Sequence, residues 1–182
     1  MIFNPLDGLI LLGLGAGAFW GFSRGSLREL IDVVCLYLAT LATTLVFQRP
    51  ARWFALNFDL PLPFTEILTF TLLLAGFFSF FLYIALDFLK PPRGRYLTIT
   101  DRMGGMIFGL LFALILISLV LFFLDHALKV NWLRWDQYRK AILETRIASL
   151  IAPFIEEFGR TILLVLRPFF PKGLPSLLEP RL

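Results

Sequence analysis

The chain has 182 residues, of which 58% are hydrophobic and 16% are charged, and its mean hydropathy is +0.81. An ordinary soluble domain carries about 25% charged and about 45–50% apolar residues, so the composition excludes that class and predicts an integral membrane protein. The net charge of +4 is spread between apolar segments and forms no stripe. This pattern indicates that the basic residues flank membrane spans, and it argues against a nucleic-acid partner.

The first predicted span covers residues 6–22, and Asp7 is the only charged side chain among these 17 residues. At about 1.5 Å per residue, such a helix crosses about 25 Å of hydrocarbon. A cleaved secretory signal is the alternative for this segment, but neither Lys nor Arg precedes the apolar run. We therefore expect a span that is retained.

A charged turn, 23–29, separates the first span from the second, which covers 30–47. Arg24 and Arg28 lie in the turn, and Asp32 lies near the start of the second span. Because only a few residues separate two apolar runs, we predict a tight helical hairpin.

The segment 48–63 contains three prolines, and it is predicted to be a connecting loop because proline blocks helix continuation. The third span, 64–89, has 26 residues and exceeds the hydrocarbon thickness. Its end residues Glu66 and Asp87 are expected in the interface, where a carboxylate costs less. The fourth span, 103–124, has 22 residues without a charge.

The predicted fold class is therefore all-α, a polytopic membrane protein with four transmembrane helices in a domain of residues 1–125. Residues 126–182 form a C-terminal region in which charges return every few positions. Apolar residues recur there at helical spacing from Leu143 to Val165, which predicts an amphipathic interfacial helix, bent or broken near Pro153. Its polar face is predicted to contain Glu144, Ser149, Glu156, Glu157 and Arg160.

Two further features of this region concern its ends. Trp132, Trp135 and Tyr138 cluster where an interfacial aromatic belt is expected. Prolines recur from Pro168 onward, which predicts an extended end of the chain.

The loops differ in their content of Lys and Arg. Two such residues lie in 23–29 and four in 90–102, against two in 48–63. The positive-inside rule then places 23–29 and 90–102 in the cytoplasm. Four more basic residues follow the fourth span on the other side and equalise the count.

A catalytic reading of the chain begins with Gly21, Ser23 and Gly25, which match the G-x-S-x-G pattern of hydrolases. That pattern presents a nucleophile only between a strand and a helix, and here it follows a membrane span. The single histidine, His126, is predicted on the opposite membrane face, about 30 Å away. With one cysteine, Cys35, the chain offers no ligand set for a transition metal. We expect no enzyme activity, no metal and no cofactor.

Asp32 is the deepest ionisable residue in the predicted spans. Arg28 lies four residues earlier on the same helical face, so a structural ion pair at the interface accounts for Asp32. A proton-relay role is the alternative, because an ionisable residue in a span is a functional candidate by default.

Small residues recur every fourth position in the first and fourth spans. In lipid, such ridges let two helix backbones approach closely. We predict that the two helices contact each other or mediate self-association through them. The ridges consist of Gly13, Gly17, Gly21 and Gly25 on the first helix and of Gly105, Gly109 and Ala113 on the fourth.

The order of these features resembles the colicin V production protein family: an aspartate that opens the first span, a glycine and arginine hairpin, and an Asp-Arg-x-Gly-Gly start to the last span. The chain departs from the family in two respects. Members often carry a basic residue and a glycine where this chain has Phe112 and Ala113, and their second span is usually richer in glycine than 30–47. The resemblance covers roughly the first 125 residues. The matching residues are Asp7, Gly21, Arg24, Gly25, Arg28, Glu29, Asp101, Arg102, Gly104, Gly105, Phe108 and Gly109.

The resemblance implies a bacterial inner-membrane protein linked to the production or export of a toxin, colicin V, and to envelope maintenance, without enzymatic activity. The residues add the expectation that the turn 23–29 meets the start of the fourth span, with Arg24, Arg28 and Glu29 pairing with Asp101 and Arg102. The leading hypothesis is a noncatalytic accessory or scaffold protein, whose partners are the lipid bilayer and other membrane proteins or further copies of itself. A small transporter or channel subunit is the alternative.

Overall fold

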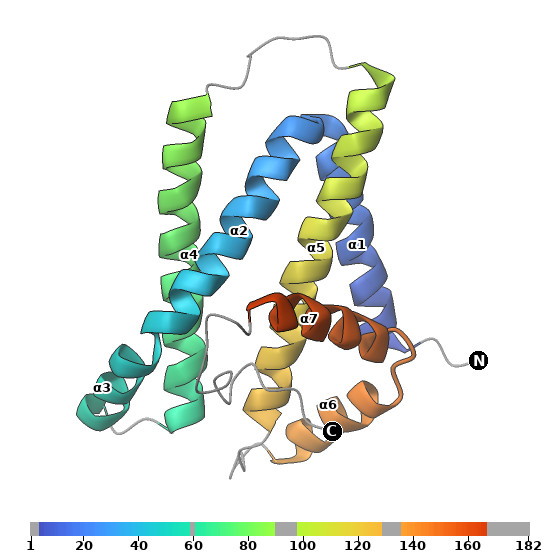
Figure 1. Cartoon of the computed structure of the whole chain (residues 1–182). Coiled ribbons are helices and arrows are strands. Elements are labelled where there is room, and N and C mark those ends of the chain that lie inside the picture. The colour runs from blue at the N-terminus through green and yellow to red at the C-terminus, as the bar shows by residue number, and fades with distance from the viewer. Residues whose placement is uncertain (1–3, 59–60, 90–97, 129–135, 167–182) are drawn as a thin grey trace. The chain divides into compact units, whose positions relative to one another are not determined.

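The computed structural model describes residues 4–58, 61–89, 98–128 and 136–166, and these parts contain helices and no strand. Four of the helices are long and apolar enough to cross a membrane. The predicted class, an all-α polytopic membrane protein, is confirmed. The helices, shown in Figure 1, are α1 (Pro5–Arg24), α2 (Ser26–Val46), α3 (Gln48–Phe58), α4 (Leu62–Leu89), α5 (Ile99–Leu128), α6 (Asp136–Ile147) and α7 (Ala152–Leu166).

The hairpin between the first two spans is tighter than the sequence predicts. The predicted turn of 23–29 shrinks to Gly25, since α1 runs to Arg24 and α2 begins at Ser26. Gly25 has a φ of 86°, which residues with a Cβ rarely adopt. A single left-handed glycine therefore reverses the chain, and the charged residues on both sides of it are helical.

The loop predicted for 48–63 is wrong for most of its length, because α3 occupies Gln48–Phe58. Pro50 lies in the first turn of α3, where its missing N–H would have had no intrahelical partner. Pro61 precedes α4 and accepts hydrogen bonds at its carbonyl from the amides of Phe64 and Thr65. The prolines thus begin helices here.

The contacts of the chain group into two compact units, one of residues 15–113 and one of residues 1–14 and 114–182. The predicted division at residue 125 stays a prediction. In the unit of residues 15–113, α4 packs on α2 and α3. The Phe47 and Phe70 rings meet edge to face with centroids 5.3 Å apart, and both side chains are buried, as is Ala51.

In the unit of residues 1–14 and 114–182, α7 lies against α5 and the start of α1. Its core consists of Ile10, Leu121, Ala152 and Ile155. A Cβ at Gly159 of α7 would lie 2.7 Å from the Ser118 Cβ, so the two helices are in close contact there.

The predicted break near Pro153 is present, because 148–151 is not helical between α6 and α7. The predicted polar face is wrong for Ser149, which is buried. Ile147, Leu150 and Phe154 of the predicted apolar face are exposed, as expected of side chains that meet lipid. The predictions for Trp132, Trp135 and the prolines from Pro168 onward concern positions outside the described residues.

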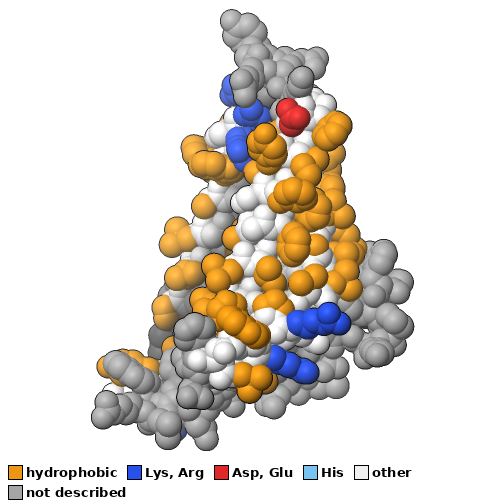
Figure 2. Space-filling model, turned by 90° about the vertical axis from the view of Figure 1, so that its left-hand side faces the viewer, with side chains coloured by type: hydrophobic (Ala, Val, Ile, Leu, Met, Phe, Trp, Pro, Cys, Tyr) orange, Lys and Arg blue, Asp and Glu red, His pale blue; other side chains and the backbone are white. Residues whose placement is uncertain are grey.

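One face of the chain is broadly apolar. Figure 2 shows hydrophobic side chains over the middle of the face that carries α4, with Lys and Arg toward its two ends. On α4, only Thr65, Thr69 and Phe70 near its start are buried. A helix that exposes this much apolar surface needs a lipid or protein environment.

Candidate functional site

The glycine ridges of α1 and α5 lie against each other. In the unit of residues 15–113, a Cβ at Gly17 would lie 2.8 Å from the Gly109 carbonyl oxygen, and one at Gly105 would lie 2.9 Å from the Gly25 Cα. Gly21 faces both Gly105 and Gly109. Backbone therefore meets backbone over two helical turns, which only glycine permits. In the other unit, Gly13 faces Ile117.

The start of α5 is joined to the start of α2 through Asp101. Its Oδ1 accepts hydrogen bonds from the Ser26 amide, at 3.1 Å, and from the Ser26 hydroxyl. The first amides of a helix have no intrahelical acceptor and carry partial positive charge, so Asp101 caps α2 from a different helix. The Asp101 amide in turn donates to the Thr98 hydroxyl at 3.4 Å.

These contacts bring together the charged segments that the sequence predicted would meet, but through other partners. Arg28 is exposed, and Asp101 bonds to Ser26 in place of the predicted arginines. The Arg102 guanidinium lies over the Phe22 ring, 5.7 Å from its centroid. The basic residue thus rests on an aromatic face of α1, an arrangement that favours a cation.

Two carboxylates of α2 share one guanidinium. Arg24 Nη1 donates to Asp32 Oδ2 at 2.6 Å and lies 3.7 Å from Glu29 Oε1. The predicted Arg28–Asp32 pair is wrong, because Arg24 reaches back over the Gly25 turn to Asp32. Glu29 is 1% exposed and Asp32 is 7% exposed. The Arg24 guanidinium also lies 5.4 Å from the centroid of the Trp20 ring.

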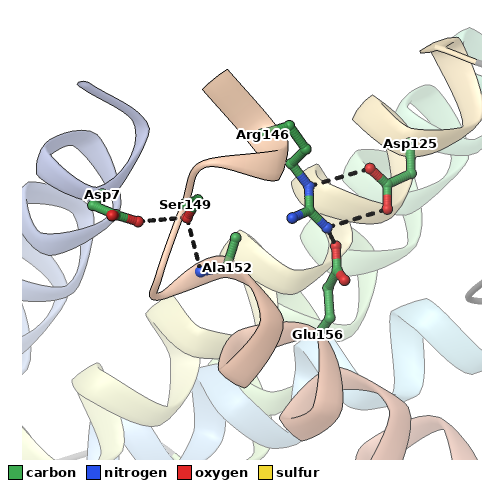
Figure 3. Close-up of polar contacts among 6 residues, drawn as sticks. All are labelled: Asp7, Asp125, Arg146, Ser149, Ala152 and Glu156. Atoms are coloured by element: carbon green, nitrogen blue, oxygen red, sulfur yellow. Dashed lines mark hydrogen bonds and ion pairs between the residues drawn. The ribbon is translucent and has the colours of Figure 1, made fainter. Parts of the chain in front are cut away.

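A second aspartate, Asp7, accepts hydrogen bonds from backbone amides in the other unit (Figure 3). Its carboxylate accepts hydrogen bonds from the Ser149 hydroxyl and from the amides of Leu150, at 3.1 Å, and Ile151, at 3.2 Å. The Ser149 hydroxyl accepts one from the Ala152 amide at 3.1 Å. Asp7 of α1 therefore satisfies the two amides just before α7, and Ser149 caps the first amide of α7.

An ion-pair cluster holds α5, α6 and α7 together in the same unit. Arg146 Nε lies 3.2 Å from Asp125 Oδ1, and its Nη2 lies 3.3 Å from Oδ2, so the pair is bidentate. Figure 3 shows Glu156 of α7 on the same guanidinium. Asn4 adds a hydrogen bond from its amide nitrogen to the Thr145 carbonyl at 2.7 Å. The start and the C-terminal part of the described chain are thus tied together.

The geometry lends no support to the hydrolase pattern. Ser23 lies in the last turn of α1, and its hydroxyl donates to the Phe19 carbonyl at 2.9 Å. A nucleophile elbow joins a strand to a helix, which this turn does not. Cys35 is a free, buried thiol, as expected of a structural cysteine. Among the described residues no group of His, Cys, Asp and Glu is placed to hold a metal ion.

A family model described as "Colicin V production protein" matches residues 6–159. The chain belongs to the colicin V production protein family. The match includes Asp7, Asp101 and both glycine ridges, and it extends past the 125 residues of the resemblance to include α6 and the first half of α7. Neither a curated protein nor a solved structure matches the chain.

For this member of the colicin V production family, several contact residues were missed by sequence reasoning. Ser26 and Ser149 accompany the two capping aspartates, and Arg146 with Glu156 completes the cluster at Asp125. A signal existed for Ser149, because a serine followed within a few residues by proline is typical of a helix start. No such signal existed for the partners of Arg146, because Asp125 and Glu156 lie 21 and 10 positions away in the sequence.

Proposed function

We propose that this colicin V production family member is a noncatalytic accessory protein of the bacterial inner membrane. It supports toxin production or release by holding another membrane protein through α4. The family match supports the link to colicin V production. Asp7, Asp101 and the ridge glycines are occupied by contacts within the chain, so we expect the partner surface elsewhere.

The observation that carries the proposal is the outward face of α4. Leu72 and Phe80 are 61% and 56% exposed, and between them lie the small residues Ala75, Gly76 and Ser79, which are also exposed. A Cβ at Gly76 would meet no atom within 4 Å. Small residues in mid-span permit close approach of a second helix, and a serine hydroxyl can hydrogen-bond across such a contact.

Crosslinking in native membranes tests this. A photoreactive amino acid is placed at Leu72 or Phe80 of α4, and, as a control, at Leu12 of α1, which is 75% exposed. We expect adducts with another membrane protein from the two α4 positions and lipid adducts alone from Leu12. Lipid adducts alone from α4 would contradict the proposal.

The proposal places the Gly25 turn and the 90–102 segment in the cytoplasm. Arg28 near that turn and Arg52 of α3 are both exposed, so each can be replaced by cysteine in a Cys35→Ser background. We expect a membrane-impermeant maleimide to label Arg52→Cys in cells whose outer membrane has been made permeable. Arg28→Cys should react only after the inner membrane is opened. If Arg28→Cys were labelled first and Arg52→Cys only after the inner membrane is opened, the chain would have the opposite orientation.

A transporter or channel subunit remains the second candidate, because Glu29 and Asp32 are buried carboxylates in a membrane span. Crosslinking of α4 to further copies of the same chain would favour it over the scaffold.

A further inference from the structure

The pair of carboxylates on α2 is not used by any helix cap or glycine contact. We propose that Glu29, Asp32 and Arg24 form a proton-binding site that takes up one proton on Glu29. This goes beyond an accessory role, because it gives the protein a ligand of its own and makes its state depend on pH.

The first argument is the count of charges. Arg24 supplies one positive charge, and Glu29 and Asp32 supply two negative charges when both are ionised, so the site carries a net negative charge. Both carboxylates are almost fully removed from solvent. An uncompensated charge is costly in such an environment, and one bound proton removes it.

The second argument is where the hydrogen bond goes. Arg24 Nη1 lies 2.6 Å from Asp32 Oδ2, a charge-assisted hydrogen bond that favours ionised Asp32. The same nitrogen is 3.7 Å from Glu29 Oε1, too far for one. Glu29 Oε1 is buried and has no hydrogen-bond partner among the described residues. The proton therefore belongs on Glu29.

The third argument is access. The Arg24 side chain is 37% exposed and stands at the end of the α1–α2 hairpin, next to the buried Glu29. Glu29 is the fourth residue of α2, so it lies within about 5 Å of the helix start at about 1.5 Å per residue. Water at the hairpin end reaches the guanidinium, and a proton needs to travel only one side chain further.

Few other ionisable groups among the described residues lie close enough to change the charge balance at Glu29 and Asp32. Arg28 of α2 attracts Asp32, but it is exposed and screened by water. The buried Cys35 thiol lies on the next turn of the same face. Elsewhere in the unit of residues 15–113, α4 carries Glu66 and Asp87 near its ends, and α3 carries Arg49 and Arg52 at its start. Asp101 and Arg102 of α5 are held by Ser26 and Phe22.

Infrared difference spectroscopy of the full chain in lipid nanodiscs tests the proposal, because a protonated carboxylic acid has a carbonyl stretch that a carboxylate lacks. On lowering the pH, we expect a band from a buried protonated carboxyl group. It should be lost in Glu29→Gln and retained in Glu157→Gln, which alters an exposed carboxylate of α7.

Asp32→Asn separates shared charge from simple burial. Without the second carboxylate, Arg24 alone balances an ionised Glu29, so the band should be lost at the same pH although Glu29 is present. A band that persists in Asp32→Asn would contradict the claim that Glu29 and Asp32 share the charge of Arg24. A band that persists in Glu29→Gln would contradict the claim that Glu29 binds the proton. Either result leaves the accessory role untouched, since crosslinking from α4 tests that role separately.

Discussion

Replacing Gly109 by alanine tests the contact between α1 and α5 with the smallest possible side chain. A Cβ at Gly109 would lie 2.8 Å from the Gly21 Cα, whereas carbon atoms in contact are normally about 3.5–4.0 Å apart. The helices must therefore separate by about 1 Å, and at such a gap a contact loses about a quarter to a half of its attraction.

The expected size of the effect follows from two opposing terms. Overpacking a close contact costs about 1–3 kcal/mol, and replacing a helical glycine by alanine returns up to about 1 kcal/mol. We expect Gly109→Ala to lower the free energy of unfolding by about 1–2 kcal/mol. Gly15→Ala is the matched control, because a Cβ there meets no atom within 4 Å and should be neutral or stabilising.

Denaturation of the purified protein in mixed micelles, with increasing sodium dodecyl sulfate, measures this difference. The chain has 4 tryptophans, whose fluorescence reports unfolding. Gly109→Ala should unfold at a lower detergent fraction than wild type and Gly15→Ala should not. Equal midpoints for the two variants would refute the close backbone contact.

Three further substitutions test the polar contacts. Asp101→Ala leaves the Ser26 amide and hydroxyl without their acceptor, and we expect a loss of about 1–3 kcal/mol in the same assay, with exposed Asp87→Ala unchanged. Asp7→Ala leaves the amides of Leu150 and Ile151, just before α7, without their acceptor and should speed proteolysis between α6 and α7, and a rate equal to that of wild type would exclude Asp7 as an anchor of this link. Arg146→Gln leaves Asp125 and Glu156 without their cation and should lower stability by about 1–3 kcal/mol, whereas Arg160→Gln, which alters a pair with the exposed Glu157, should change it by less than about 1 kcal/mol.

The four spans were predictable because hydropathy reports burial in lipid directly. The spans around Ile10, Phe70 and Leu119 are apolar over many residues, and this signal does not depend on tertiary partners. The glycine ridges were also visible, since a four-residue repeat of small side chains has a direct physical meaning in membranes. The repeat left open whether a ridge meets the same chain or another copy, and contacts within the chain occupy Gly17, Gly21, Gly105 and Gly109.

The polar partners were predicted poorly because they depend on how distant segments meet. Asp101 lies 75 positions from Ser26, and Asp7 lies 142 positions from Ser149, so helical periodicity carries no information about either pair. Arg24 pairs with Asp32 across a glycine turn, where the i, i+4 rule for a continuous helix favoured Arg28. The loop predicted over α3 failed because Pro50 lies in the first turn of that helix, where proline is compatible with helical structure.

The most direct test of the accessory role is the release of active colicin V by producing cells in which this chain replaces the resident family member. Gly76→Leu fills the open small-residue face of α4, and Gly15→Leu places the same side chain at an open position on α1. At equal membrane levels, we expect Gly76→Leu to release much less toxin and Gly15→Leu to match the unaltered chain. Normal toxin release by Gly76→Leu would contradict the role of α4 in holding a partner.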